Sequence, residues 1–154
     1  MHIFFMMILS FVATVSFAVL FFVPPKALMP VGLVGVIGWL ILVLSLNHNI
    51  SNVAGSFMAA LVIAFLSELL ARQFKMPVIV FTVAGIVPLV PGSSAFSTMI
   101  DFVNGRYMNG LAKGAETLLI AGAIATGLVI SGAFMRFGWR RQHVPTKTPP
   151  NNSK

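Results

Sequence analysis

An uncharged apolar run of 21 residues, Ile3 to Val23, constrains the fold more than any other feature of this chain. At about 1.5 Å per residue, a helix of this length spans roughly 30 Å, the thickness of a bilayer's hydrocarbon core. Similar runs cover residues 27–46, 53–71 and 117–137. Only 8% of the residues are charged, too few to cover a surface that faces water. The sequence therefore predicts an all-α fold, a polytopic transmembrane helical bundle.

A further apolar run, residues 78–90, is interrupted by proline. Pro88 lies inside it and Pro91 follows, and a proline ring removes a backbone donor and clashes with the preceding helical turn. A short amphipathic helix is expected from Ala95 to about Asn104, where Asn104-Gly105 resembles a C-cap. We therefore predict about five spans, with a broken fourth segment. In the four-span alternative, this segment dips into the membrane and returns.

The chain divides into a transmembrane domain, residues 1–137, and a basic, Pro/Asn-rich tail, residues 138–154, which we expect to be disordered and cytoplasmic. The first run does not read as a signal peptide, because no Lys or Arg precedes it and Pro24-Pro25-Lys26 stands where a cleavage site would be. We interpret it as a retained span.

Basic residues predict the orientation of the spans. Cytoplasmic loops of membrane proteins are enriched in Lys and Arg. With five spans and the tail inside, the N-terminus lies outside. The inner side then carries eight basic residues and the outer side two: Lys26, Arg72, Lys75, Arg136, Arg140, Arg141, Lys147 and Lys154 against Arg106 and Lys113.

Small side chains recur at helical spacing in three of the runs. Such stripes let neighbouring helices approach closely. The three sets are Gly32, Gly35 and Gly38; Ser56, Ala60 and Ala64; and Ala123, Gly127 and Ser131.

The segment Pro88 to Ser94 is the strongest candidate for a binding site. Gly92, Ser93 and Ser94 precede the expected half-helix, whose unpaired N–H groups and positive dipole end suit an anion such as a carboxylate. Pro88 and Pro91 would fix the break, and Ser93 or Ser94 would cap the helix or contact the ligand. The alternative is a simple kink between two spans that binds nothing.

Three charged residues are candidates for ion coupling. Asp101 lies in the expected half-helix, and an acidic residue in a membrane segment is a functional candidate as a proton or cation relay. The alternative is an interfacial residue facing water. Glu68 and Arg72 are four apart, so they either line a cytoplasmic vestibule or form a structural clasp at a helix end.

Enzyme and cofactor signals are missing from the sequence. There is no cysteine, the three histidines are far apart, and Leu111 stands where a phosphate loop needs Lys, so neither a metal nor a nucleotide site is predicted. Nucleic-acid binding is not expected, since half of the basic residues lie at or beyond the end of the last span and suit lipid head groups. An intramembrane hydrolase using Ser93 or Ser94 lacks a candidate base.

The stretch Pro77 to Phe96 resembles the signature of the threonine/serine exporter family, most closely its short-subunit branch. The Pro-x-x-Pro-Gly core at residues 88–92 is the specific part. Weaker supporting pieces are residues 23–28, 35–39 and 56–60, so the resemblance covers roughly residues 18–131.

The resemblance implies a partner and a substrate class. Family exporters consist of two membrane halves, on one chain or on two, and this sequence is similar to the second half standing alone. A larger membrane subunit would complete the transporter. Family substrates include threonine and serine, and succinate for some two-chain members, and each carries a carboxylate. We therefore expect a subunit of a secondary-active exporter in the bacterial inner membrane, with no cofactor and no enzymatic activity. The alternative is a non-conducting membrane scaffold or regulatory subunit.

Overall fold

The computed structural model describes residues 2–140, and within this range the chain is helical with no strand. The prediction of an all-α fold is therefore confirmed. In chain order, the elements are α1 (His2–Leu20), α2 (Pro25–Asn47), α3 (Asn52–Phe74), α4 (Val78–Ile86), the 3₁₀ helix η1 (Val87–Leu89), α5 (Gly92–Val103) and α6 (Tyr107–Arg140).

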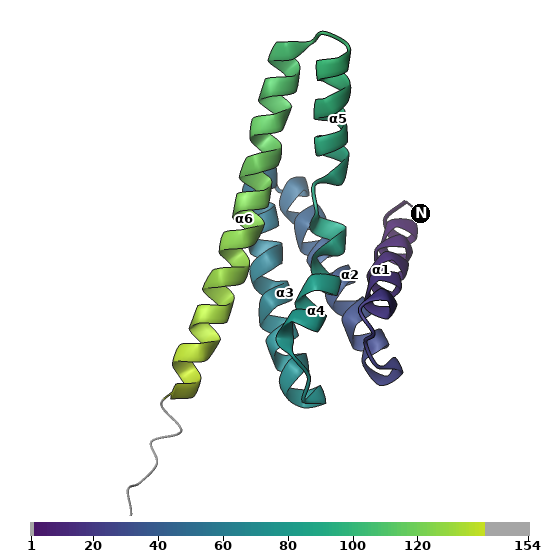
Figure 1. Ribbon diagram of the computed structural model, residues 1–154, viewed down its shortest axis with the longest axis vertical. Coiled ribbons are helices and arrows are strands. Elements are labelled where there is room, and N and C mark those ends of the chain that lie inside the picture. Colours follow the sequence, from purple (N-terminus) through teal and green to yellow (C-terminus); the bar gives the residue numbers. More distant parts are fainter. Residues whose placement is uncertain (1, 141–154) are drawn as a thin grey trace, which may run out of the picture.

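The helices form two parts that share α6 (Figure 1). In the first part, α1 packs on α2, α2 packs on α3, and α4 lies against all three. The lower half of α6 covers the other side of α3. In the second part, α5 and the first half of α6 form a hairpin that rises beyond the α2–α3 turn.

The number of candidate spans agrees with the prediction. By length and apolar composition α1, α2, α3 and α6 can each cross a membrane, and α4–η1 with α5 forms a further pair bent by 50°. This bend leaves α5 running onward from α4 rather than back beside it, and α1 begins at the upper end of the bundle of α1 to α4, whereas α6 ends at the lower end (Figure 1). Length and composition therefore allow four crossings, or five if the bent pair forms one span.

One C-terminal motif ends four of the helices. A residue shortly after each helix is left-handed, at Phe22, Asn49, Lys75 and Gly105. The next N–H then reaches back to the carbonyl five residues earlier, as in Val23 N to Ala18 O at 3.0 Å. This Schellman arrangement satisfies carbonyls that lipid cannot. It confirms the C-cap that Asn104-Gly105 predicts.

The predicted small-residue stripes line close helix contacts. A Cβ at Gly127 would lie 3.0 Å from the Phe57 carbonyl oxygen and 3.1 Å from Ala60 Cβ, so α6 touches the backbone of α3. The glycines of α2 divide between two neighbours: Gly35 lies against Thr14 of α1, whereas Gly38 lies against Ile63 of α3. A spacing of three residues turns about 300° around the helix, so these glycines fan out rather than sharing one face.

Two predicted boundaries are wrong. Helix α5 begins at Gly92 rather than near Ala95, because Pro91 stands at its N-cap and fixes the start. Helix α6 begins at Tyr107 rather than at Thr117, where the last apolar run starts, so residues 107–116 are helical as well. Their glycines pack against α5, and this tertiary contact outweighs their low helix propensity. The predicted tail beyond Arg140 lies outside the described residues.

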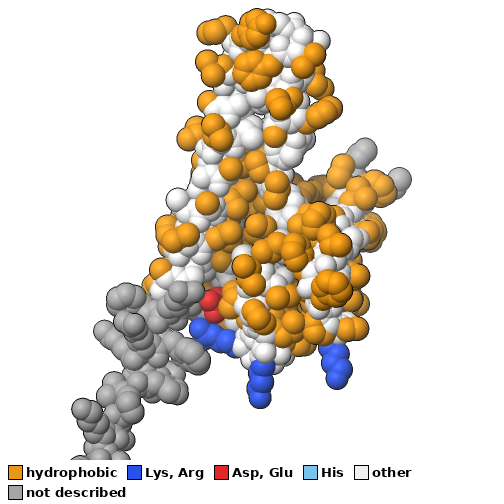
Figure 2. Space-filling view, in the orientation of Figure 1, with side chains coloured by type: hydrophobic (Ala, Val, Ile, Leu, Met, Phe, Trp, Pro, Cys, Tyr) orange, Lys and Arg blue, Asp and Glu red, His pale blue; other side chains and the backbone are white. Residues whose placement is uncertain are grey.

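The surface is apolar over most of the molecule (Figure 2). Lys and Arg side chains gather at the lower end in this view, where the α1–α2 and α3–α4 turns lie. Lys26, Arg72 and Lys75 belong to these turns and the adjoining helix ends. Cations at this level suit the phosphates of lipid head groups.

Candidate functional site

The break between α4 and α5 is built by two prolines. Helix α4 tightens into η1, which contains Pro88, and Val90 is then extended at φ −60° and ψ 125°. Pro91 adopts φ −76° and ψ 53° and precedes the first residue of α5. Leu89 is buried and lies near Gly38, which ties the break to the bundle. The structure thus joins Pro88, Pro91 and the start of α5 in one short irregular segment.

The serines after the break lie inside the first turn of α5 rather than ahead of it. Neither caps the helix; instead, the Ser94 hydroxyl donates to the Pro91 carbonyl at 3.4 Å. The Gly92 N–H donates to the Val90 carbonyl at 2.7 Å. In helix geometry the next two N–H groups, of Ser93 and Ser94, have no acceptor within the helix. The capping hypothesis for the serines is wrong, while their N–H groups have the direction that an anion site requires.

The beginning of α5 is open to approach. Gly92 and Ser93 are exposed and Ser94 is half-buried. No heavy atom outside the helix lies within 4 Å of the position that a Cβ at Gly92 would occupy. The space beside Gly92 is therefore open in the described part of the chain.

Asp101 is a separate centre at the other end of α5. It lies seven residues beyond Ser94, or about 10 Å along the helix. Its side chain is buried against α6, so the alternative of an interfacial residue that faces water is wrong. Arg106 approaches one carboxylate oxygen and Lys113 the other, each at 2.7 Å. The three groups close the α5–α6 hairpin near its tip.

The sequence reasoning missed the residues that hold this hairpin together. Gly110 lies against the ring of Phe102 and Gly114 against Thr98, with 3.2 Å from each predicted Cβ position to the nearest side-chain carbon. The spacing Gly110-x-x-x-Gly114 is the available signal, because small residues four apart indicate close helix packing. The partners of Asp101 had no such signal, since they depend on the fold of the hairpin.

Glu68 and Arg72 form the predicted pair in α3. The closest side-chain atoms are 3.9 Å apart, and Arg72 is about half exposed. The pair lies at the α3–α4 end of the bundle, whereas the start of α5 lies toward the opposite end (Figure 1). The structure therefore does not bring Glu68 and Arg72 to Gly92.

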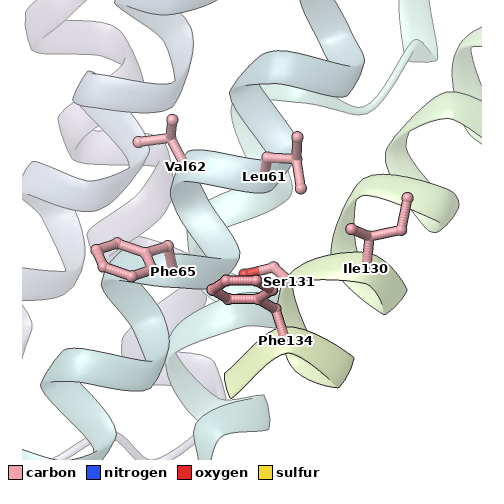
Figure 3. A pocket seen from close by; sticks show the side chains of 6 residues that line it. All are labelled: Leu61, Val62, Phe65, Ile130, Ser131 and Phe134. Carbon is pink, nitrogen blue, oxygen red and sulfur yellow. The ribbon is translucent and has the colours of Figure 1, made fainter. Parts of the chain in front are cut away.

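A shallow groove of about 350 Å³ lies between α3 and the lower half of α6 (Figure 3). Phe65 lines the groove from α3, and Phe134 lines it from α6, where its ring overlaps Ser131 in this view; Ser131 is the one polar side chain in the lining. Leaving a carboxylate in such an apolar surface is unfavourable, because no group there replaces its water. The groove suits a hydrocarbon chain and is distinct from the start of α5.

Comparison with known proteins shows a family match and similarity to other proteins. The family described as "Threonine/Serine exporter, ThrE" matches residues 6–134, which include the whole of α2 to α5. A protein of Haemophilus influenzae described as "Uncharacterized protein" is 32% identical over 134 residues. The match covers 82% of this chain but 45% of the relative, so the chain spans less than half of the relative's length. No solved structure matches the chain.

Proposed function

Because the chain belongs to the threonine/serine exporter family, we propose that it is a subunit of a secondary-active exporter of small carboxylate-bearing metabolites. The substrates would be threonine and serine, or a dicarboxylate such as succinate. The observation that carries the proposal is the family match across the broken α4–α5 segment, whose open first turn has the geometry of an anion site. A larger membrane subunit of the same family would supply the rest of the pathway.

In this proposal, the substrate carboxylate binds at the first turn of α5. The N–H groups of Ser93 and Ser94 would donate to it, and Gly92 would leave room for its approach. Pro88 and Pro91 would keep the two half-helices apart, so that α5 can move relative to α4 during alternating access. An ion gradient would provide the energy. We assign Asp101 to holding the hairpin, because two cations share its carboxylate; ion coupling through Asp101, Glu68 or Arg72 stays a prediction.

The proposed location is the bacterial inner membrane, with the N-terminus outside and the C-terminus in the cytoplasm. In support, Lys26, Arg72 and Lys75 lie at the end of the bundle where α6 also ends. The excess of Lys and Arg on one side favours that side as cytoplasmic.

Efflux from cells that lack this chain tests the proposal. Cells are loaded with a threonine-containing dipeptide, or with succinate, and release is followed with the chain restored alone, with the larger subunit, or not at all. Release that requires both chains is the expected result and identifies the substrate. Unchanged release of threonine, serine and succinate in all three conditions would contradict the proposed export.

The second candidate function is a scaffold or regulatory subunit that conducts nothing, favoured by the glycine and alanine contacts throughout the bundle. The variant Ser93→Ala/Ser94→Ala keeps both backbone N–H groups and tests only the hydroxyls, whereas Gly92→Leu blocks the approach. If Gly92→Leu assembles with the larger subunit and still supports full flux, the carboxylate site is wrong and the scaffold role gains.

A further inference from the structure

The α5–α6 hairpin is held by few contacts within the described chain. Among the described helices, α5 packs on α6 alone, whereas α3 and α4 each contact three or more elements. Within residues 2–140, nothing covers the outer face of the hairpin (Figure 1). A short helix such as α5, which packs on one neighbour, requires contact with another apolar surface for stability.

The hairpin projects past the end of the bundle. Gly127 of α6 lies beside residues 57–61 of α3, and both helices run in the same direction. Ile120, two turns earlier, is therefore level with Val53 at the start of α3, and the two belong to one packed cluster. The 13 residues from Tyr107 to Leu119 extend about 20 Å beyond that level. Helices α2 and α3, with 23 residues each, already match the bilayer's hydrocarbon core of about 30 Å.

The projecting part is nevertheless apolar. Phe96, Met99 and Val103 form a stripe on α5 with exposed fractions of 67%, 68% and 87%, and Met108 on α6 is 80% exposed. Apolar side chains also cover the visible face of this end of the molecule (Figure 2). With the bilayer centred on α2 and α3, the hairpin lies beyond the polar α2–α3 turn and outside the hydrocarbon, where contact of its apolar side chains with water is unfavourable. Protein is the remaining cover.

We infer that the outer face of the α5–α6 hairpin is the docking surface for the larger exporter subunit, and this inference rests on the proposed function. The occupant is a membrane-protein segment with an apolar helical face. It would correspond to part of the Haemophilus influenzae protein that has no counterpart in this chain, since the match covers 45% of that protein.

Single cysteines test this surface directly, since the chain has no cysteine of its own. Val103→Cys reports on the hairpin, and Val129→Cys, on α6 beside the bundle and 69% exposed, is the matched control. Each variant is expressed in cells with and without the larger family subunit and labelled with benzophenone maleimide. After illumination, the Val103→Cys variant should crosslink to the larger subunit, and the Val129→Cys variant should not. The double variant Met99→Ser/Val103→Ser should reduce copurification with the larger subunit by about tenfold or more.

Three results would overturn the inference. Crosslinks from the hairpin probe at position 103 only to a second copy of this chain would make the surface a homodimer interface. Lipid adducts alone would place the hairpin in the bilayer. Equal crosslinking from the probes at positions 103 and 129 would remove any preference for the hairpin. Efflux is measured in the same cells. If export requires both chains but the probe at position 103 forms no crosslink to protein, the docking surface is rejected and the proposed function stands.

Discussion

Replacing Gly127 with leucine should separate α3 from α6, because α6 approaches the backbone of α3 at this residue. A Cβ at position 127 would lie 3.0 Å from the Phe57 carbonyl oxygen and 3.4 Å from the Leu61 nitrogen. Both atoms belong to the helix backbone, which cannot rotate away as a side chain can. The added carbons of leucine would therefore push the whole of α3 outward.

The magnitude follows from two opposing effects. Overpacking a close contact costs about 1–3 kcal/mol. Removing a glycine from a helix interior is favourable by roughly 0.8 kcal/mol. Gly122→Leu isolates the second effect, because Gly122 lies in the same helix with no heavy atom within 4 Å of its Cβ position. The difference between the two variants should therefore equal the packing cost, which corresponds to about a 5- to 150-fold change in the unfolding equilibrium.

The assay is unfolding in mixed micelles with increasing dodecyl sulfate, followed by tryptophan fluorescence. We expect Gly122→Leu to unfold at the same detergent fraction as the original protein or a higher one, and Gly127→Leu at a clearly lower one. Equal midpoints for the two leucine variants would refute the close approach of α3 and α6, and with it the packing role of the small-residue stripe on α6.

Three other predictions follow from the same structure. Gly92→Leu points into open space, so copurification with the larger subunit should be unchanged while efflux falls at least about tenfold; unchanged efflux would contradict the site. Asp101→Asn removes the charge that holds Arg106, so trypsin should cleave after Arg106 severalfold faster in micelles, and an unchanged cleavage rate would show that the ion pairs do not close the hairpin. The buried Ser56 hydroxyl has no hydrogen-bond partner within the described residues, so Ser56→Ala should stabilise the protein by up to about 1 kcal/mol in the same detergent titration, and a loss of stability would reveal a missed partner.

The sequence was most reliable where one physical requirement acts over a long segment. An apolar run near 20 residues must satisfy its backbone internally, and a helix is the structure that does so in lipid. This requirement predicts α1, α2 and α3 to within a few residues. Proline predicts the break after Ile86 for a similarly local reason, because its ring prevents a continuous helix regardless of the tertiary contacts.

The tertiary structure decided the features that depend on contacts between distant residues. Residues 107–116 look irregular alone, and they become helical where Gly110 and Gly114 receive Phe102 and Thr98. Asp101 looks like an isolated acid until the hairpin places it between Arg106 and Lys113. Local sequence determines whether a backbone can be helical, since that is settled within a few residues. The length by which a helix extends past its neighbours determines which side chains it buries and which faces remain available for another protein. Only the tertiary structure determines this length.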